Sequence, residues 1–203
     1  MDTSSLTPSY VITVIVTLLI SMTVHEFMHG YVAHLLGDTT ARDEGRLTLN
    51  PIAHIDPFMT VLLPVITLLF FGAPILAAKP VPFNPARVRH DEFGAAMVAA
   101  AGPLSNLLLA IISSLFFHSA SGFVHDALKV FIELNVALFV FNILPIPPLD
   151  GSRVLYAFSP RPLQELLEQA EPYGFFIIII LVLAGGLGGI LGGLNNLVLN
   201  LLT

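Results

Sequence analysis

One short segment of the sequence carries residues that could perform metal chemistry. His25-Glu26-Phe27-Met28-His29 is an H-E-x-x-H motif inside a long apolar run. On a helix the two histidines lie about 40° apart and one turn along, so both imidazoles can reach one metal ion. This spacing is typical of a zinc site in which His25 and His29 are ligands and Glu26 is the general base that acts on water.

The position of the motif strengthens this interpretation. A charged side chain at the middle of a membrane-spanning helix costs roughly 2.5–3.5 kcal/mol on insertion scales. A divalent cation that binds neutral imidazoles offsets such a cost. The alternative is a polar cluster that only holds helices together. Because the chain has no cysteine, a metal must be held by histidine and carboxylate side chains.

A catalytic zinc site generally has three protein ligands and one open position, so a third ligand is needed. Asp150 is preferred because it directly follows a proline-rich break at residues 144–149. Non-helical backbone at membrane depth is tolerated where it lines protein or a wet cavity, and such breaks are where membrane proteins build sites. The other candidates outside the motif are His54, His90, Asp126 and Glu133.

The composition indicates a membrane protein. Of 203 residues, 55% are hydrophobic and only 11% are charged, whereas soluble domains carry about 25% charged residues. The formal net charge of −6 offers no electrostatic footprint for a phosphate backbone, so nucleic acid is excluded as a partner. The length predicts a single domain over residues 1–203 with at most about six membrane crossings.

Apolar runs predict the elements that position these residues. We expect spanning helices at residues 9–36, 94–117 and 127–144, and apolar segments of undecided course at 58–78 and 173–202. The fold class is therefore an all-α polytopic membrane protein with about four to six membrane segments. A glycine cluster at residues 185–193 could form a packing face, a kink or a re-entrant turn.

Two polar segments between these runs are expected near the active site. Residues 45–49 predict a short strand or β-hairpin, and the proline-rich residues 79–85 predict an extended loop. Small residues at 95–102 predict close helix packing, and residues 159–171 have the spacing of a short surface helix.

The basic residues predict an orientation. If residues 58–78 dip into the membrane and return, seven of the eight basic residues share one face and Lys129 lies opposite. That asymmetry makes the shared face cytoplasmic, and a full crossing by residues 58–78 would weaken it. We therefore expect a multi-pass protein of the cell membrane whose active site is reached from the cytoplasm. The seven residues are Arg42, Arg46, Lys79, Arg87, Arg89, Arg153 and Arg161.

Taken together, these motifs resemble the site-2 protease family of intramembrane zinc metalloproteases, in its compact form without a PDZ or CBS domain. The resemblance implies a zinc-dependent endopeptidase that hydrolyses a peptide bond in or near a transmembrane segment of single-span membrane proteins, within membrane lipid. It also implies that Asp150 is the third zinc ligand, that Glu26 is the general base, and that Asn142 and Asn106 position the substrate. The motifs are H-E-x-x-H at 25–29, GRLTLNP at 45–51, HIDP at 54–57, KPVPFNP at 79–85, AGPLSN at 101–106 and FNILPIPPLDG at 141–151.

Several alternatives stay open on the residues alone. Asn142 could equally bridge carbonyls that are freed at the proline break, and Asn106 could equally form a hydrogen bond between helices. A competing function is a membrane metal-ion transporter or another metal-binding membrane protein. For a protease, an unwound substrate could add as a strand to residues 45–49 or 79–85. The sequence does not indicate the oligomeric state.

Overall fold

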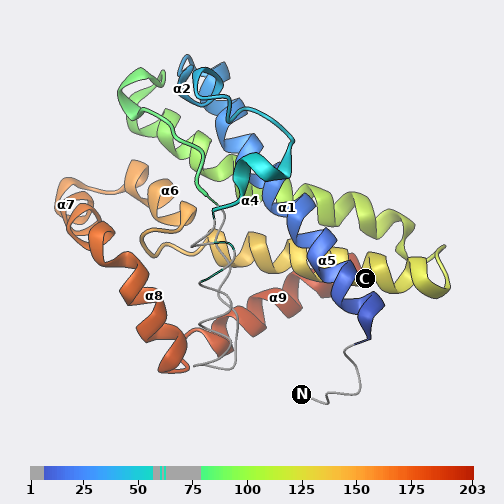
Figure 1. Ribbon diagram of the computed structural model, residues 1–203. Helices are drawn as coiled ribbons and strands as arrows, with labels where there is room; N and C mark the ends of the chain where they lie inside the picture. Colours follow the sequence, from blue (N-terminus) through green and yellow to red (C-terminus); the bar gives the residue numbers. More distant parts are fainter. Residues whose placement is uncertain (1–6, 57–59, 61, 63–78) are drawn as a thin grey trace.

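The computed structural model describes residues 7–56, 60, 62 and 79–203 (Figure 1). Within those residues the regular structure is helical and no strand is present, so the predicted all-α class is confirmed. The three longest helices are α1 (Pro8–Leu35), α4 (Asp91–Phe117) and α5 (Gly122–Asn142). The apolar segment predicted at residues 58–78 lies outside the described residues, apart from positions 60 and 62.

Two of the described helices, α1 and α4, are long and apolar enough to cross a membrane. They contain 28 and 27 residues, which gives each a length of about 40 Å against a hydrocarbon thickness of about 30 Å. Helix α1 begins at Pro8, where the side chain of Thr7 accepts a hydrogen bond from the Tyr10 N–H. Both helices are therefore longer than the hydrocarbon thickness.

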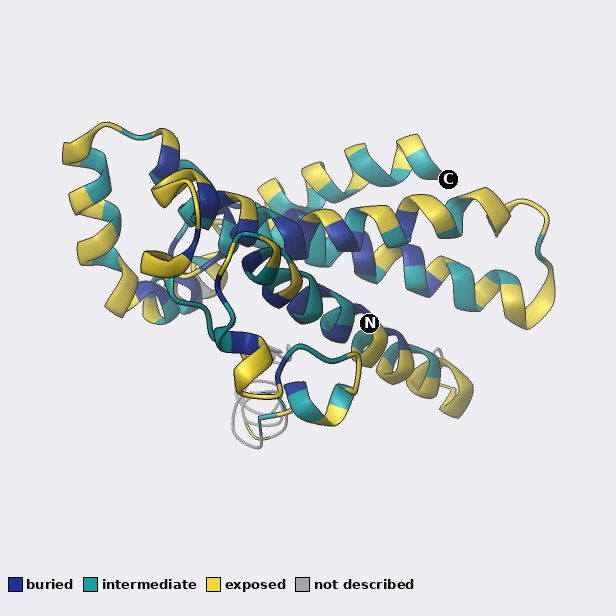
Figure 2. Cartoon of the chain, turned by 90° about the horizontal axis from the view of Figure 1, so that it is seen from above, coloured by how far each residue is buried: buried dark blue, intermediate teal, exposed yellow. Residues whose placement is uncertain are grey.

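Helix α4 lies between α1 and α5, and Figure 2 shows buried residues along the faces where these helices meet. The α4–α5 contact is built around Ala110, Ile132, Val136 and Val140, which are at most 2% exposed. Close approach of α4 to its neighbours depends on small side chains, as the sequence predicted. The buried small residues of α4 are Gly94, Ala96, Ala99, Ala101, Gly102, Ser105 and Ala110.

The strand or hairpin expected at residues 45–49 does not form. After the short helix α2 (Thr40–Asp43), Gly45 has a φ of 68° and the chain turns back. The N–H groups of Arg46 and Leu47 both donate to the Ala41 carbonyl, at 2.7 and 3.1 Å. The chain then enters the short helix η2 (Pro51–His54). Donors that a strand ladder would need are therefore used in closing local turns.

Residues 79–84 form the expected extended segment, which leads into η4 (Pro85–Arg87). The segment is held along its length. The Lys79 N–H donates to the His54 carbonyl at 3.0 Å, and Arg46 Nη2 donates to the Lys79 carbonyl at 2.9 Å. Beyond η4, the Arg89 N–H donates to the Leu36 carbonyl at 2.9 Å. These bonds place the segment beside the C-terminal end of α1.

Asp38 is the buried link between α1 and this segment. It is fully buried, and its carboxylate accepts from the Thr40 N–H and hydroxyl and, at 2.6 Å, from the Asn84 N–H. Burial raises the pKa of Asp38, but the hydrogen bonds from Thr40 and Asn84 outweigh it and hold the pKa below its usual range. The ionised side chain therefore fixes the geometry at the end of α1.

The C-terminal part is a chain of shorter helices: α6 (Asp150–Phe158), α7 (Arg161–Ala170), η5 (Glu171–Tyr173), α8 (Gly174–Leu183) and α9 (Gly188–Leu202). Helix α7 is the predicted surface helix. The glycine cluster falls on a turn between α8 and α9, where Gly185 has a φ of 72°, so the two helices form a V (Figure 1). The first glycines of the cluster therefore form a turn, which is one of the three predicted alternatives. Helix α9 returns to pack on α5.

Candidate metal centre

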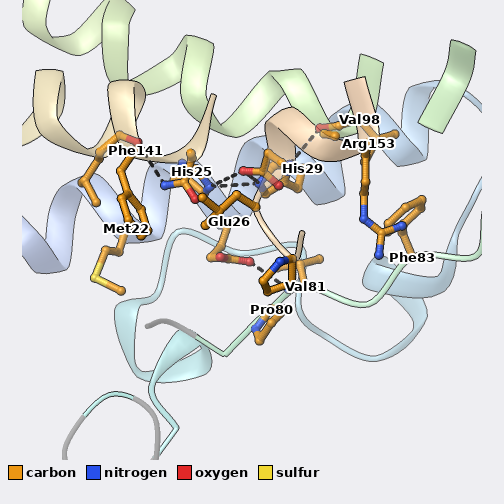
Figure 3. Close-up of a pocket in the computed structure, with 16 residues that line it drawn as sticks. Met22, His25, Glu26, His29, Pro80, Val81, Phe83, Val98, Phe141 and Arg153 are labelled. Atoms are coloured by element: carbon orange, nitrogen blue, oxygen red, sulfur yellow. Dashed lines mark hydrogen bonds and ion pairs between the residues drawn. The ribbon is translucent and has the colours of Figure 1, made fainter. Parts of the chain in front are cut away.

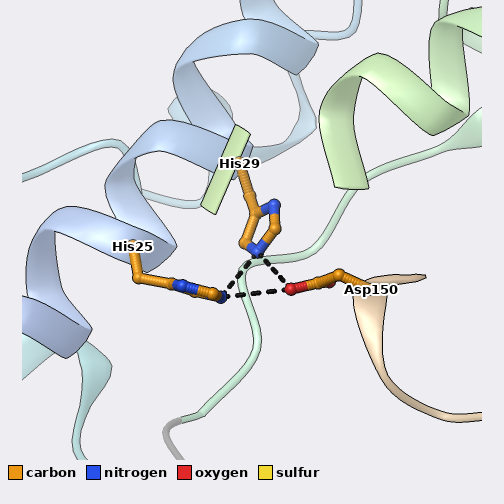
Figure 4. Close-up of side chains that lie close together, drawn as sticks. All are labelled: His25, His29 and Asp150. Carbon is orange, nitrogen blue, oxygen red and sulfur yellow. Dashed lines mark hydrogen bonds and ion pairs between the residues drawn. The ribbon is translucent and has the colours of Figure 1, made fainter. Parts of the chain in front are cut away.

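Three side chains converge at the crossing of α1, α4 and α6 (Figure 4). His25 and His29 come from successive turns of α1, and Asp150 is the first residue of α6. The two Nε2 atoms lie 3.0 Å apart, and they lie 3.2 and 3.3 Å from the Asp150 Oδ2. This trio is the group found among the described residues that could hold a metal ion. The structure thus brings together the three predicted ligands.

The partners of the two rings decide which atoms face the centre. His29 Nδ1 lies 2.8 Å from the Val98 carbonyl, which can only accept, so Nδ1 carries the proton. His25 Nδ1 lies 2.6 Å from the Asn106 Oδ1 and donates in the same way. In the neutral rings both Nε2 lone pairs therefore point at the Asp150 carboxylate. Three electron-rich atoms this close repel one another unless a cation lies between them.

The spacing of the three atoms suits zinc. Ligands about 2.0–2.1 Å from a tetrahedral ion lie about 3.3–3.4 Å from each other. The measured separations of 3.0, 3.2 and 3.3 Å approach that value. Two imidazoles and one carboxylate leave the fourth position open, as in catalytic zinc sites.

Two glycines make this approach possible. A Cβ on Gly102 of α4 would lie 2.4 Å from His29 Nε2 and 2.6 Å from His25 Nε2. A Cβ on Gly151 would lie 2.1 Å from the Ile143 carbonyl oxygen. The first glycine leaves room beside the two rings. The second allows α6 to begin directly against the end of α5, which carries Asp150 to the histidines.

Glu26 lies beside the three converging side chains and is tied to the extended segment. Its Oε2 accepts a hydrogen bond of 2.8 Å from the Val81 N–H, and the residue is 9% exposed. In Figure 3 the Glu26 carboxylate lies between the two histidines and Val81. The predicted general base is thus held next to the candidate metal position by a main-chain donor.

These groups line a cavity of about 520 Å³ (Figure 3). The cavity wall includes Met22 and Phe141, the extended segment at Phe83, and the guanidinium of Arg153. That guanidinium lies 5.4 Å from the centre of the Phe83 ring and forms an ion pair with Glu171. A space of this size next to a metal-binding trio can admit a stretch of peptide.

The two predicted asparagines lie in different environments. Asn142 lines the cavity and donates through Nδ2 to the Leu138 carbonyl at 3.0 Å. Asn106 is fully buried and contacts the ring edge of His25 that faces away from Asp150. Substrate positioning stays a prediction for both, and the contact observed for Asn106 is with the ring of His25, a candidate metal ligand.

The other candidate ligands lie apart from this centre. His54 is buried, and its Nε2 donates to the Thr48 carbonyl at 2.8 Å. His90 precedes α4 with a φ of 73°. Asp126 and Glu133 lie on α5 beside His125 and Lys129, respectively. None of the four belongs to the trio found among the described residues.

Sequence reasoning missed Asn135. This residue of α5 is fully buried, and its Oδ1 accepts from Asn106 Nδ2 at 3.0 Å. A signal was present, since Asn135 and Asn142 are seven residues apart and share one face of a helix. A polar amide in an otherwise apolar helix needs a partner, which is a reason to examine it.

Comparison with known proteins identifies the family. The chain is 39% identical over 178 residues to YwhC of Bacillus subtilis, a candidate zinc metalloprotease, with 82% of this chain and 78% of that protein covered. The chain belongs to peptidase family M50, the site-2 proteases. The model of peptidase family M50 itself matches residues 118–185. Rip2 of Mycolicibacterium smegmatis, also named as a candidate zinc metalloprotease, is 31% identical over 180 residues, covering 87% of this chain and 68% of Rip2. No solved structure matches the fold significantly.

Family membership confirms three predictions from the sequence. As an M50 protein the chain is a zinc metalloprotease, and zinc is its cofactor. The two apolar helices α1 and α4, together with the family, make it a membrane protein.

Proposed function

We propose that the protein is an intramembrane zinc endopeptidase, in which residues 1–203 act as one domain. Its substrates are single-span membrane proteins, and it cleaves a peptide bond in or near their transmembrane segments within membrane lipid. His25, His29 and Asp150 hold the zinc ion, and Glu26 is the general base. The observation that carries the proposal is the convergence of three potential metal-ligand atoms in the wall of a cavity between apolar helices.

The depth of the trio supports cleavage within the membrane. His29 and His25 lie six and ten residues before the last residue of α1, Leu35. At 1.5 Å per residue they are about 9 and 15 Å from that end of the helix. A peptide bond that reaches them must enter between helices rather than bind on the protein surface.

The side chains around the cavity divide the reaction between them. Zinc, when bound, supplies a Lewis acid that polarises the scissile carbonyl and makes water more acidic. Glu26 accepts the proton of the attacking water and returns it to the leaving amine. The Val81 N–H holds one oxygen of that carboxylate, which leaves the other free for the proton. Asn142 donates one N–H to the Leu138 carbonyl, so its second N–H and its Oδ1 can bind a peptide group of the substrate.

Strand addition by the substrate is less well supported than the sequence suggested. No strand forms at residues 45–49. In residues 79–84 the two prolines have no N–H, and the N–H groups of Lys79, Val81 and Asn84 already donate within the protein. An extended substrate could pair with this edge mainly through its own donors, unless the Val81 N–H leaves Glu26.

The arrangement of basic residues supports a multi-pass protein with a cytoplasmic active site. Arg87 ends η4 and Arg89 follows it beside the end of α1, and Arg153 contacts Phe83 in the same region. Lys129 lies near Thr7, at the opposite end of α1. The positive-inside rule then assigns the end that bears Arg87 to the cytoplasm.

Because the chain has no cysteine, single cysteines can test this orientation. A membrane-impermeant maleimide applied to intact cells should label Ser119→Cys, after the far end of α4, and should spare Glu44→Cys until the cells are opened. Both positions are exposed. The reverse pattern would contradict the orientation.

The decisive test of the enzyme uses purified protein in lipid and a panel of single-span membrane substrates. The wild type should cleave at least one of them, a chelator should abolish cleavage, and added zinc should restore it. Glu26→Gln should abolish cleavage while its zinc content stays near that of the wild type. Glu133→Gln, which changes an exposed carboxylate on α5, is the matched control and should cleave normally. Cleavage by Glu26→Gln would refute the assignment of the base.

A further inference from the structure

We propose that Asn135 of α5 is a positioning residue of the metal centre, because through Asn106 it fixes the proton of His25 on Nδ1 and so leaves Nε2 unprotonated toward the metal. This inference rests on the metal site of the proposed function and on no assumption about the substrate. It gives α5, which carries none of the three candidate ligands, a role in positioning one of them.

A continuous chain of hydrogen bonds connects the two residues to the metal-binding ring. His25 Nδ1 donates to Asn106 Oδ1 at 2.6 Å. The Asn106 Nδ2 donates to the Ser21 carbonyl at 3.2 Å and to Asn135 Oδ1 at 3.0 Å. The Asn135 Nδ2 donates in turn to the Phe131 carbonyl at 2.8 Å. The chain thus runs from α1 through α4 to α5.

The main-chain carbonyls at the ends of this hydrogen-bond chain determine how the two amides are oriented. An amide can rotate by 180° and exchange its oxygen for its nitrogen, but a main-chain carbonyl can only accept. The Phe131 carbonyl therefore selects the orientation in which Asn135 turns its oxygen toward Asn106. That oxygen and the Ser21 carbonyl are both acceptors, and together they select the orientation in which Asn106 turns its own oxygen toward His25.

The selected orientation decides the tautomer of the metal-binding ring. With an oxygen at Nδ1, the neutral His25 ring holds its proton there and presents an unprotonated Nε2 to Asp150 and His29. If Asn106 were reversed, its NH2 group would face Nδ1 and would favour the tautomer with the proton on Nε2. A protonated Nε2 cannot bind a metal ion.

Burial makes this chain rigid. Asn106 and Asn135 are both fully buried, so water cannot replace a lost partner. Ile132 and Val136, which are near Asn135 along α5, are apolar and also buried. Without Asn135, one of the two acceptors that orient Asn106 is missing, and the other is the carbonyl of Ser21 alone.

Zinc affinity measures this role directly. Asn135→Leu keeps the branched shape of the side chain, with some added bulk, and removes the acceptor. We expect it to weaken zinc binding about tenfold, at the lower end of the 10–100-fold range for outer partners of metal ligands. The apparent dissociation constant is read by competition with a chromogenic chelator. Asn135→Asp keeps an oxygen acceptor and, with a protonated carboxyl, a donor to Phe131, and should restore most of the affinity.

A double-substitution cycle separates positioning from general packing. If Asn135 acts through Asn106, adding Asn135→Leu to Asn106→Leu should weaken zinc binding no further than Asn106→Leu alone. Ile132→Ala is the matched packing control: it should lower thermal stability and leave the zinc affinity of the folded protein unchanged. Additive losses in the cycle, or an equal loss in Ile132→Ala, would overturn the proposal.

Two further outcomes are informative. If Asn135→Leu does not fold, the same cycle is run with Asn135→Ala, which removes the acceptor without adding bulk. If Asn135→Leu folds and binds zinc as the wild type does, the inference fails even if the wild type is an active protease. If the cycle shows coupling but no substrate is cleaved by the wild type, the proposed function fails and the inference stands.

Discussion

Replacing Gly102 by alanine should remove zinc binding while leaving the fold intact. The added Cβ would lie 2.4 Å from His29 Nε2 and 2.6 Å from His25 Nε2, which is 1.0 and 0.8 Å short of the 3.4 Å at which ordinary contact begins. The rings can relieve this contact only by moving. A metal site tolerates deviations of about 0.2 Å in its ligand distances, so a shift several times larger breaks the coordination.

The loss of zinc affinity in Gly102→Ala has an expected lower limit. We expect Gly102→Ala to weaken zinc binding at least 100-fold, which corresponds to about 2.7 kcal/mol at 1.36 kcal/mol for each factor of ten. The helix itself does not suffer, because alanine is more favourable than glycine inside a helix by about 1 kcal/mol. Loss of the metal and loss of the fold are therefore predicted to separate.

Thermal unfolding with and without zinc tests this separation. Zinc should raise the midpoint of the wild type, because a ligand that binds only the folded state stabilises it, and should not raise that of Gly102→Ala. Gly193→Ala, in α9, has nothing within 4 Å of its added Cβ and should behave as the wild type. If Gly102→Ala binds zinc normally, the two rings do not hold the metal in the positions described, and the reasoning is refuted.

Two more substitutions test the segment beside the site. Val81→Pro removes the N–H that holds Glu26, so cleavage should fall at least about tenfold with normal zinc content; unchanged rates of cleavage would show that this hydrogen bond has no role in catalysis. Asp38→Asn places an NH2 group where Thr40 or Asn84 donates, so it should lower the unfolding free energy by about 1–3 kcal/mol. Because the pKa of Asp38 is lower in the folded state, its stabilisation is present above about pH 4 and lost as the pH falls further. The difference between wild type and Asp38→Asn should therefore shrink in acid, and a constant difference would contradict this account.

The metal trio could be predicted from the sequence because local rules determine most of it. Helical spacing places His25 and His29 on one face whatever the rest of the fold does. Asp150 required one further step, which was the expectation that a proline-rich break marks a site. The structure places Asp150 Oδ2 at 3.2 and 3.3 Å from the histidine Nε2 atoms, as a shared metal site would require.

The features that could not be predicted depend on turn geometry or on tertiary partners. Residues 45–49 alternate as a strand does, yet the Ala41 carbonyl captures the N–H groups of Arg46 and Leu47. That capture follows from the turn at Gly45, which periodicity does not report. Similarly, the amide of Asn106 can be called polar and buried from the sequence, but its contact with His25 depends on how α4 crosses α1.

The polar groups buried among the long helices are therefore best understood as one connected system. His25, Asn106 and Asn135 form a chain of side-chain hydrogen bonds that ends at the main-chain carbonyls of Ser21 and Phe131. The unbalanced part lies on the other side of the His25 ring, where three acceptors meet. Since buried polar groups are costly unless paired, a divalent cation placed among these three atoms would be stabilised by all of them. The same three residues line the cavity, so a zinc ion that they held would be accessible from it.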